Sequence, residues 1–210
     1  TIAGRGVMLH DHPQNAGPLG VIGSSSANTL AAEADVVLAV GTGLQDFTTG
    51  SWSVFGNETM RLISLNAARY DAHKHRALSV VGDALVGIEE LGQALDDWKG
   101  PEVWASQAKS LYGEWNRTVD EHSGPTDTVP PSYAHVVGAI NRVCDETDLA
   151  LTAAGGFPGE LCKNWKTKAV GTFHCEFGFS CMGYEIAGGW GAKMADPARD
   201  VIVLVGEGSY

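Results

Sequence analysis

The fold class of this chain follows from one stretch of sequence, Val201-Ile202-Val203-Leu204-Val205-Gly206-Glu207-Gly208-Ser209-Tyr210. Its first five residues are apolar and mostly β-branched, which is typical of a strand covered on both faces in a parallel sheet. The Gly-acid-Gly sequence that follows predicts a sharp turn at the carboxyl end of this strand, the edge at which open α/β sheets bind their ligands. The carboxylate of Glu207 therefore either approaches a metal-bound phosphate or caps a following helix.

The composition is that of a globular α/β protein. With 210 residues, 44% of them hydrophobic, and 27 glycines, the chain can form one large or two modest domains and belongs to neither the disordered nor the fibrous class. It carries 14 basic and 25 acidic residues, a net charge of −11, without a basic cluster. We therefore expect no nucleic-acid partner.

The cellular location of the protein and the redox state of its cysteines are predicted from features that the sequence lacks. It has no apolar run of transmembrane length and no signal peptide, so we expect a cytoplasmic protein without a membrane partner. Its cysteines form no CxxC pair and are too widely spaced for a small-domain disulfide framework, which favours reduced, partly buried thiols over a zinc site. These cysteines are Cys144, Cys162, Cys175 and Cys181.

Residues 1–100 are predicted to form a first domain with a parallel sheet, because strands and helices alternate along them. The predicted strands are 35–40, 61–66 and 78–81, and the predicted helices are 27–34, after a serine cap, and one capped by Asp83. The turn Gly41-Thr42-Gly43 follows the first of these strands and could seat a nucleotide phosphate, although it lacks the third glycine of the dinucleotide fingerprint.

Residues 101–131 are predicted to be a connector, and residues 132–210 a second α/β domain. The connector combines a packed helix over 101–122 with a proline-rich linker. The second domain is predicted to contain a helix capped by Ser132, strands at 149–152 and around 172–174, a helix from about Tyr184, and the strand at 201–205.

Other catalytic and metal motifs are weak. No Gly-x-Ser-x-Gly elbow is present, so no serine nucleophile is visible. The pairs His10/His12 and His73/His75 would each share one face of a strand, but neither has a third ligand, which favours surface histidines. Cys181 is interpreted as a structural thiol.

Three stretches together resemble the thiamine-diphosphate enzymes of the acetolactate-synthase and pyruvate-oxidase type. They are ADVVLAVGTG (34–43), SCMGYEIA (180–187) and VGEGS (205–209), and their order matches the central domain of that family followed by the first part of its diphosphate-binding domain. Three further stretches narrow the resemblance to a branch that acts in inositol catabolism. They are HDHP (10–13), QDFTTGSW (45–52), which is the most specific, and AGGFPGEL (154–161).

The resemblance implies thiamine diphosphate and Mg²⁺ as cofactors, with the chemistry residing in the cofactor. Glu207 occupies the position of the acid that binds the metal in this family. Met182 matches the bulky apolar residue that holds the cofactor in its bent form. The other positions that match the cofactor site are Gly155, Gly156, Gly183, Gly206, Gly208 and Ser209.

The chain departs from the family in two ways. Glu207 replaces the usual aspartate and adds a methylene at a site where Mg²⁺ tolerates little geometric error. The pyrimidine-binding domain, which supplies the catalytic glutamate of the family, is absent, so we expect no catalytic residue in this chain. The sequence looks cut at both ends, and we expect an inactive fragment of a longer protein, with the asparagine metal ligand beyond Tyr210. Flavin binds the central domain of some relatives, but nothing in this sequence signals flavin.

The function implied for the longer protein is hydrolytic opening of a small cyclic polyhydroxy diketone by C–C cleavage, in a homodimer or homotetramer. Two alternatives stay open at this point. One is a carboligase or decarboxylase like acetolactate synthase, and the other is a non-catalytic nucleotide-binding module built on 41–43.

Overall fold

In the computed structural model, which describes residues 1–210, three parallel strands form the sheet of the first half of the chain. The strands are β1 (Val36–Val40), β2 (Arg61–Asn66) and β3 (Leu78–Val81), hydrogen-bonded in that order. Val36 lies opposite Arg61, and Ile63 lies opposite Leu78. The predicted strands of this half are therefore confirmed.

The helices of this half begin at the caps that the sequence predicts. Ser24 accepts a hydrogen bond from the N–H of Ala27 at the start of α1 (Ser25–Glu33), and Asp83 caps α4 (Ala84–Leu95). Such side-chain acceptors satisfy backbone donors that the first turn of a helix leaves unpaired. Four short elements were not predicted: η1 (Arg5–Val7), α2 (Asp46–Thr49), α3 (Arg69–Ala72) and η2 (Lys74–Arg76).

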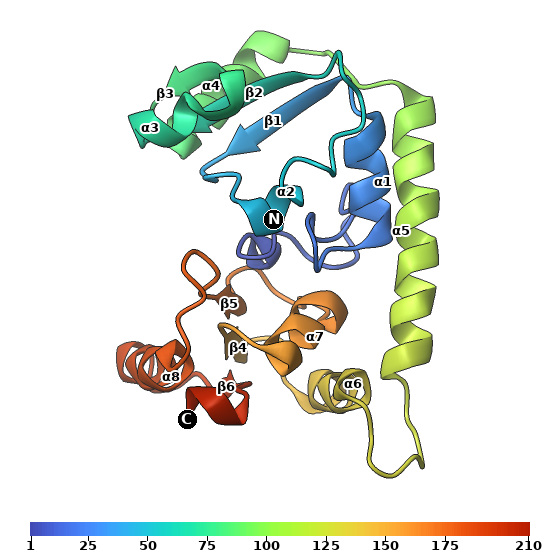
Figure 1. Cartoon of the computed structure of the whole chain (residues 1–210), viewed down its shortest axis with the longest axis vertical. Helices are drawn as coiled ribbons and strands as arrows, with labels where there is room; N and C mark the ends of the chain where they lie inside the picture. Colours follow the sequence, from blue (N-terminus) through green and yellow to red (C-terminus); the bar gives the residue numbers. More distant parts are fainter.

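The connector is a single long helix, α5 (Glu102–Ser123), followed by a linker without regular structure. Figure 1 shows α5 running along one side of the molecule, from the first sheet to the second half of the chain. The predicted packing of its apolar stripe is correct only in part. Val119 is buried at the C-terminal end, where α6 and α7 lie, whereas Val103 is 80% exposed at the other end.

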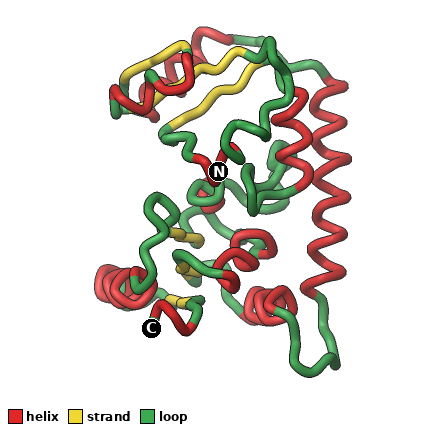
Figure 2. Tube along the Cα trace, in the orientation of Figure 1, coloured by secondary structure: helices red, strands yellow, loops and turns green.

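The second half contains another three-stranded parallel sheet, in the order β5 (Phe173–Cys175), β4 (Leu149–Thr152), β6 (Val201–Val203). The helices around it are α6 (Tyr133–Val143), α7 (Gly156–Asn164) and α8 (Tyr184–Ala195), and the chain ends in the short η3 (Glu207–Ser209). Figure 2 shows α8 on one side of this sheet and α6 and α7 on the other. Helix α7 was not predicted, because its glycines and proline read as a loop.

The largest apolar core lies in this second half and takes in the start of the chain. Ten buried residues form it, among them Val137, Leu161 and Leu204, and Ile2 is packed into the same cluster. The apolar side chains of α4, by contrast, are exposed: Leu85 by 66% and Ile88 by 49%. None of the helices combines the length and the apolar character needed to cross a bilayer.

Candidate functional site

The candidate site lies at the carboxyl edge of the second sheet, where β4 and β6 end side by side. These strands pair in parallel, with Leu151 opposite Val203, so the chain leaves both in the same direction. The hydroxyl of Thr152 donates to the carbonyl oxygen of Leu204 at 2.8 Å and ties the two strand ends together. The loops 153–156 and 204–209 therefore leave the sheet from neighbouring positions, as expected for an α/β site.

Gly155 turns the first of these loops into α7. Its φ of 127° lies in a region that side-chain-bearing residues rarely adopt, so glycine suits this N-cap position. The first N–H groups of an α-helix have no acceptor within the helix, and the helix dipole places partial positive charge there. The loop from β4 thus points backbone donors at the sheet edge, which is an arrangement that binds phosphate.

Met182 and Gly183 meet the second loop. A Cβ atom added to Gly208 would stand 3.8 Å from the sulfur of Met182, and one added to Gly183 would stand 3.8 Å from the carbonyl oxygen of Ser209. The Met182 side chain is 66% exposed even though it is large and apolar. Packing within this chain does not account for that side chain, which leaves it available to a ligand.

Glu207 projects from η3, and its carboxylate is exposed. The N-cap of η3 is Gly206, no side chain caps this turn, and the Glu207 carboxylate accepts no hydrogen bond from the chain. A Cβ atom at Gly206 would meet nothing within 4 Å, so the edge has room for a ligand.

The chain has no group of three His, Cys, Asp or Glu side chains that could hold a metal. A cation bound to Glu207 would take its other ligands from backbone, water or phosphate oxygens.

Two glutamates that the sequence analysis missed hold the loop that carries Met182. Glu176 accepts hydrogen bonds from the N–H of Phe179 at 3.0 Å and from that of Cys181 at 2.7 Å, and these bonds lower the pKa of its carboxyl group. Glu185 is fully buried and accepts a hydrogen bond from the N–H of Gly183 at 3.1 Å. The sequence signal that could have identified these two glutamates is that one acid stands at each end of this glycine-containing loop.

The first half of the chain contacts this loop through the QDFTTGSW stretch. The ring of Phe47 meets that of Phe177 edge-on, with 5.7 Å between centroids and 82° between planes. The stretch that made the resemblance most specific therefore lies against the segment between β5 and α8. Aromatic contacts of this kind add specific geometry to apolar burial.

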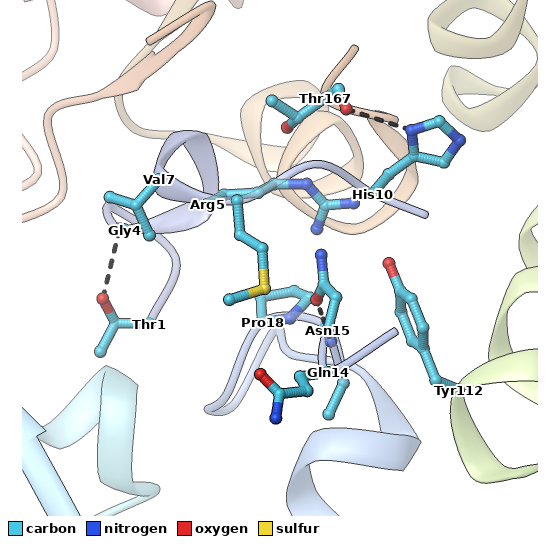
Figure 3. Close-up of a pocket in the computed structure, with 13 residues that line it drawn as sticks. Thr1, Gly4, Arg5, Val7, His10, Gln14, Asn15, Pro18, Tyr112 and Thr167 are labelled. Carbon is cyan, nitrogen blue, oxygen red and sulfur yellow. Dashed lines mark hydrogen bonds between the residues drawn. The ribbon is translucent and has the colours of Figure 1, made fainter. Parts of the chain in front are cut away.

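Arg5 provides a second tie between the two halves. Its Nε donates to the carbonyl oxygen of Trp165 at 2.9 Å and its Nη1 to that of Cys162 at 2.6 Å, at the C-terminal end of α7. Burial lowers the pKa of this guanidinium. Figure 3 shows Arg5 at a cavity of about 220 Å³, with Asn15 and Tyr112 facing it. This cavity lies at the junction of the two halves and is separate from the sheet edge.

The turn 41–43, the other candidate phosphate site, has an acid beside it. Gly43 lies against Asp71, whose carboxylate oxygen would be 3.2 Å from an added Cβ atom. Lys74 pairs with Asp71 at 2.8 Å and also donates to the carbonyl oxygen of Gly43. Lys74 is thus already paired, and a carboxylate beside the turn disfavours phosphate.

The histidine pairs do not have the strand geometry that would place each pair on one face. Residues 10–12 precede α1, His73 follows α3, and His75 lies in η2. The Nδ1 atom of His73 is 2.8 Å from the carbonyl oxygen of Arg69, and the His75 ring stacks on Trp52 at 4.3 Å between centroids. The preference for the surface-histidine interpretation is consistent with these contacts.

The cysteines are free, and three of them are buried, as expected for reduced, partly buried thiols. The interpretation of Cys181 as a structural thiol is wrong, because it is exposed in the loop before Met182. The sulfur atoms of Cys162 and Cys175 lie 3.8 Å apart inside the second core. This contact with Cys162, together with burial, raises the pKa of the Cys175 thiol.

Comparison with known proteins matches both halves of the chain. Residues 1–91 match the family described as thiamine pyrophosphate enzyme, central domain, and residues 153–210 match its C-terminal TPP binding domain, where TPP is thiamine diphosphate. A 3D-(3,5/4)-trihydroxycyclohexane-1,2-dione hydrolase of Geobacillus thermodenitrificans is 36% identical over 233 residues, and proteins of the same name from Bacillus anthracis and Bacillus cereus are 35% identical over 235 residues. Each alignment covers the whole of this chain and 36% of the relative. From these matches, the chain belongs to the thiamine pyrophosphate enzymes.

Proposed function

We propose that this chain is part of a thiamine-diphosphate- and Mg²⁺-dependent hydrolase that opens the ring of trihydroxycyclohexane-1,2-dione. The observation that carries the proposal is the contact of Met182 and Gly183 with Gly208 and Ser209, beside the exposed carboxylate of Glu207. The relatives with this printed name align over the whole chain, including the 45–52 stretch. Because the chain spans 36% of their length, the activity is a property proposed for the complete protein.

Each part of the sheet edge fits one part of the cofactor. Gly155 and Gly156 open α7 toward the edge, so that its first N–H groups can receive the diphosphate. Glu207 would donate a carboxylate oxygen to the metal ion that neutralises the diphosphate, next to Gly206, where an added Cβ atom would meet nothing within 4 Å. Met182 offers an apolar surface to the rings, and Gly183 and Ser209 close the loop beside it.

When bound, the cofactor supplies the centre that attacks a carbonyl and stores a carbanion. The net reaction adds one water across the bond between the two carbonyl carbons. One of these carbons ends as a carboxylic acid and the other as an aldehyde, without oxidant or reductant. The residues of this chain bind and orient the cofactor, and none of them is assigned as the proton donor or acceptor.

The assignment to the hydrolase branch of the family is supported by the position of the QDFTTGSW stretch. This stretch lies against the loop that carries Met182, through the contact of Phe47 with Phe177. A carboligase or decarboxylase would share the sheet edge and differ in such neighbouring segments. Division of the chain at 100/101 and at 131/132, a homodimer or homotetramer, and a cytoplasmic location stay predictions.

The proposal is tested by incubating the complete protein with trihydroxycyclohexane-1,2-dione, thiamine diphosphate and Mg²⁺. We expect one new carboxylic acid group per substrate consumed, and no turnover when either cofactor is left out. Efficient condensation of pyruvate instead would favour the carboligase. Binding of flavin or nicotinamide nucleotides without binding of thiamine diphosphate would favour the nucleotide-binding module.

A further inference from the structure

Glu185 is a buried acid with only half of its hydrogen-bonding capacity used. It is the second residue of α8, and its side chain has no exposed surface. Its Oε2 accepts the hydrogen bond from the N–H of Gly183, while its Oε1 is buried without any partner. A buried carboxylate oxygen without a donor destabilises the folded state, so stability alone does not explain an acid at this position.

Glu185 lies next to the candidate site. Helix α8 packs on β6 and β4, and Gly189, one turn after Glu185, is pressed against Val203. Glu185 accepts a hydrogen bond from the N–H of Gly183, and a Cβ atom added to Gly183 would stand 3.8 Å from the carbonyl oxygen of Ser209, so the carboxylate lies near the loop that follows β6. It therefore sits within the second half of the chain, close to the edge at which the candidate loops leave the sheet.

The one hydrogen bond that Glu185 makes is to the residue that positions Met182. Gly183 is the N-cap of α8 and has a φ of 91°, a left-handed conformation that glycine adopts without strain. The carboxylate reaches back to the N-cap N–H in the manner of a capping box, at the positive end of the helix dipole. The same turn brings Met182 against Gly208 and Gly183 against Ser209.

We propose that Glu185 is a positioning residue for the cofactor site. Through its hydrogen bond to the N–H of Gly183, it fixes the Met182–Gly183 turn against the 206–209 loop. This inference rests on the proposed cofactor-dependent function and adds a residue to it. The acid touches neither cofactor nor substrate and acts through the N–H of Gly183. Because Oε1 is buried without a donor, it lowers the stability of the folded state, and this loss accompanies the placement of an acceptor at this buried point.

The test compares two substitutions in the complete protein. Glu185→Met fills a similar volume without an acceptor, and Glu185→Gln keeps one oxygen for the N–H of Gly183. Because Glu185→Met also removes the unpartnered oxygen, the cofactor-free variant should melt no lower than the wild type. Its Kd for thiamine diphosphate, measured by calorimetry at saturating Mg²⁺, should nevertheless rise by about tenfold or more, because the turn loses its anchor. Glu185→Gln should bind within about threefold of the wild type.

Val137→Ala is the control, since it opens a cavity in the core of the second half, and its helix α6 lies on the other side of the sheet from α8. It should lower the melting temperature and leave the cofactor Kd unchanged, which separates positioning from general destabilisation. Wild-type affinity in Glu185→Met, or a loss in Glu185→Gln as large as that in Glu185→Met, would overturn the proposal. If the wild-type protein itself binds no thiamine diphosphate, the proposed function fails instead.

Discussion

The sulfur of Met182 lies 3.8 Å from the point at which a Cβ atom on Gly208 would stand. The two residues belong to different loops, one before α8 and one after β6, and they meet because both loops lie at the same sheet edge. An apolar side chain and the loop proposed to bind the metal are thereby held as one surface. A Cβ atom at position 208 would be in ordinary van der Waals contact with this sulfur, so a residue larger than alanine there should displace Met182.

Gly208→Val should move Met182 and weaken cofactor binding, whereas Gly208→Ala should not. The extra methyl of alanine would make an ordinary contact with the sulfur, but the branches of valine would occupy its space. The Kd for thiamine diphosphate is the measurement. Equal affinity of the two variants would show that Met182 and Gly208 are not coupled.

Glu207→Ala should abolish cofactor-dependent activity in the complete protein and leave its melting temperature in the absence of cofactor unchanged. The carboxylate is exposed and makes no hydrogen bond within the chain, so its loss removes a metal ligand and little else. Glu207→Asp, which restores the shorter acid, should bind Mg²⁺ at least as well as the wild type. Near-normal activity of Glu207→Ala at saturating cofactor and Mg²⁺ would contradict the metal site.

Met182→Ala should weaken thiamine diphosphate binding without destabilising the protein. Met194 offers a matched control, because it is 68% exposed, against 66% for Met182, and lies at the far end of α8. Two equally exposed methionines should contribute equally little to stability, so both variants should melt like the wild type. Only Met182→Ala should raise the Kd, and an equal effect in both would remove the special role of Met182.

Glu176→Gln should destabilise the protein at neutral pH but not in acid. Hydrogen bonds from the N–H groups of Phe179 and Cys181 lower the pKa of Glu176 from its ordinary value of 4.5. A carboxyl group with a lowered pKa stabilises the folded state above its unfolded-state pKa, and this contribution is lost as the pH falls through the folded-state pKa. Melting temperatures measured across this range should converge below that point. Glu146→Gln, at an exposed site, should match the wild type at every pH.

Arg5→Ala should destabilise the protein by about 2 kcal/mol, because it leaves several carbonyl oxygens at the end of α7 without donors. Arg5→Lys should recover only part of this loss, since an ammonium group cannot reproduce the planar fork of a guanidinium. Urea unfolding is the measurement. A change below about 0.5 kcal/mol in Arg5→Ala would mean that water replaces the guanidinium at no cost.

Local sequence patterns determined much of the fold. Apolar β-branched runs predicted the strands, and Ser24, Asp83 and Ser132 all cap the helices that were placed after them. These signals are local, because a cap and the N–H groups that it satisfies lie within three residues of each other. Glu207 was a candidate for the same reason, since a strand that ends in Gly-acid-Gly needs no distant residue to be recognised.

Only the tertiary structure decided which loops meet and which acids support them. The strand order β5-β4-β6 brings Met182 to Gly208. The packing of α8 on β6 buries Glu185, which is hydrogen-bonded to the residue after Met182. Arg5 reaches the end of α7 across more than 150 residues of sequence. Local sequence does not establish the role of such residues, because an acid or arginine is normally solvated, and its role depends on what the fold places around it.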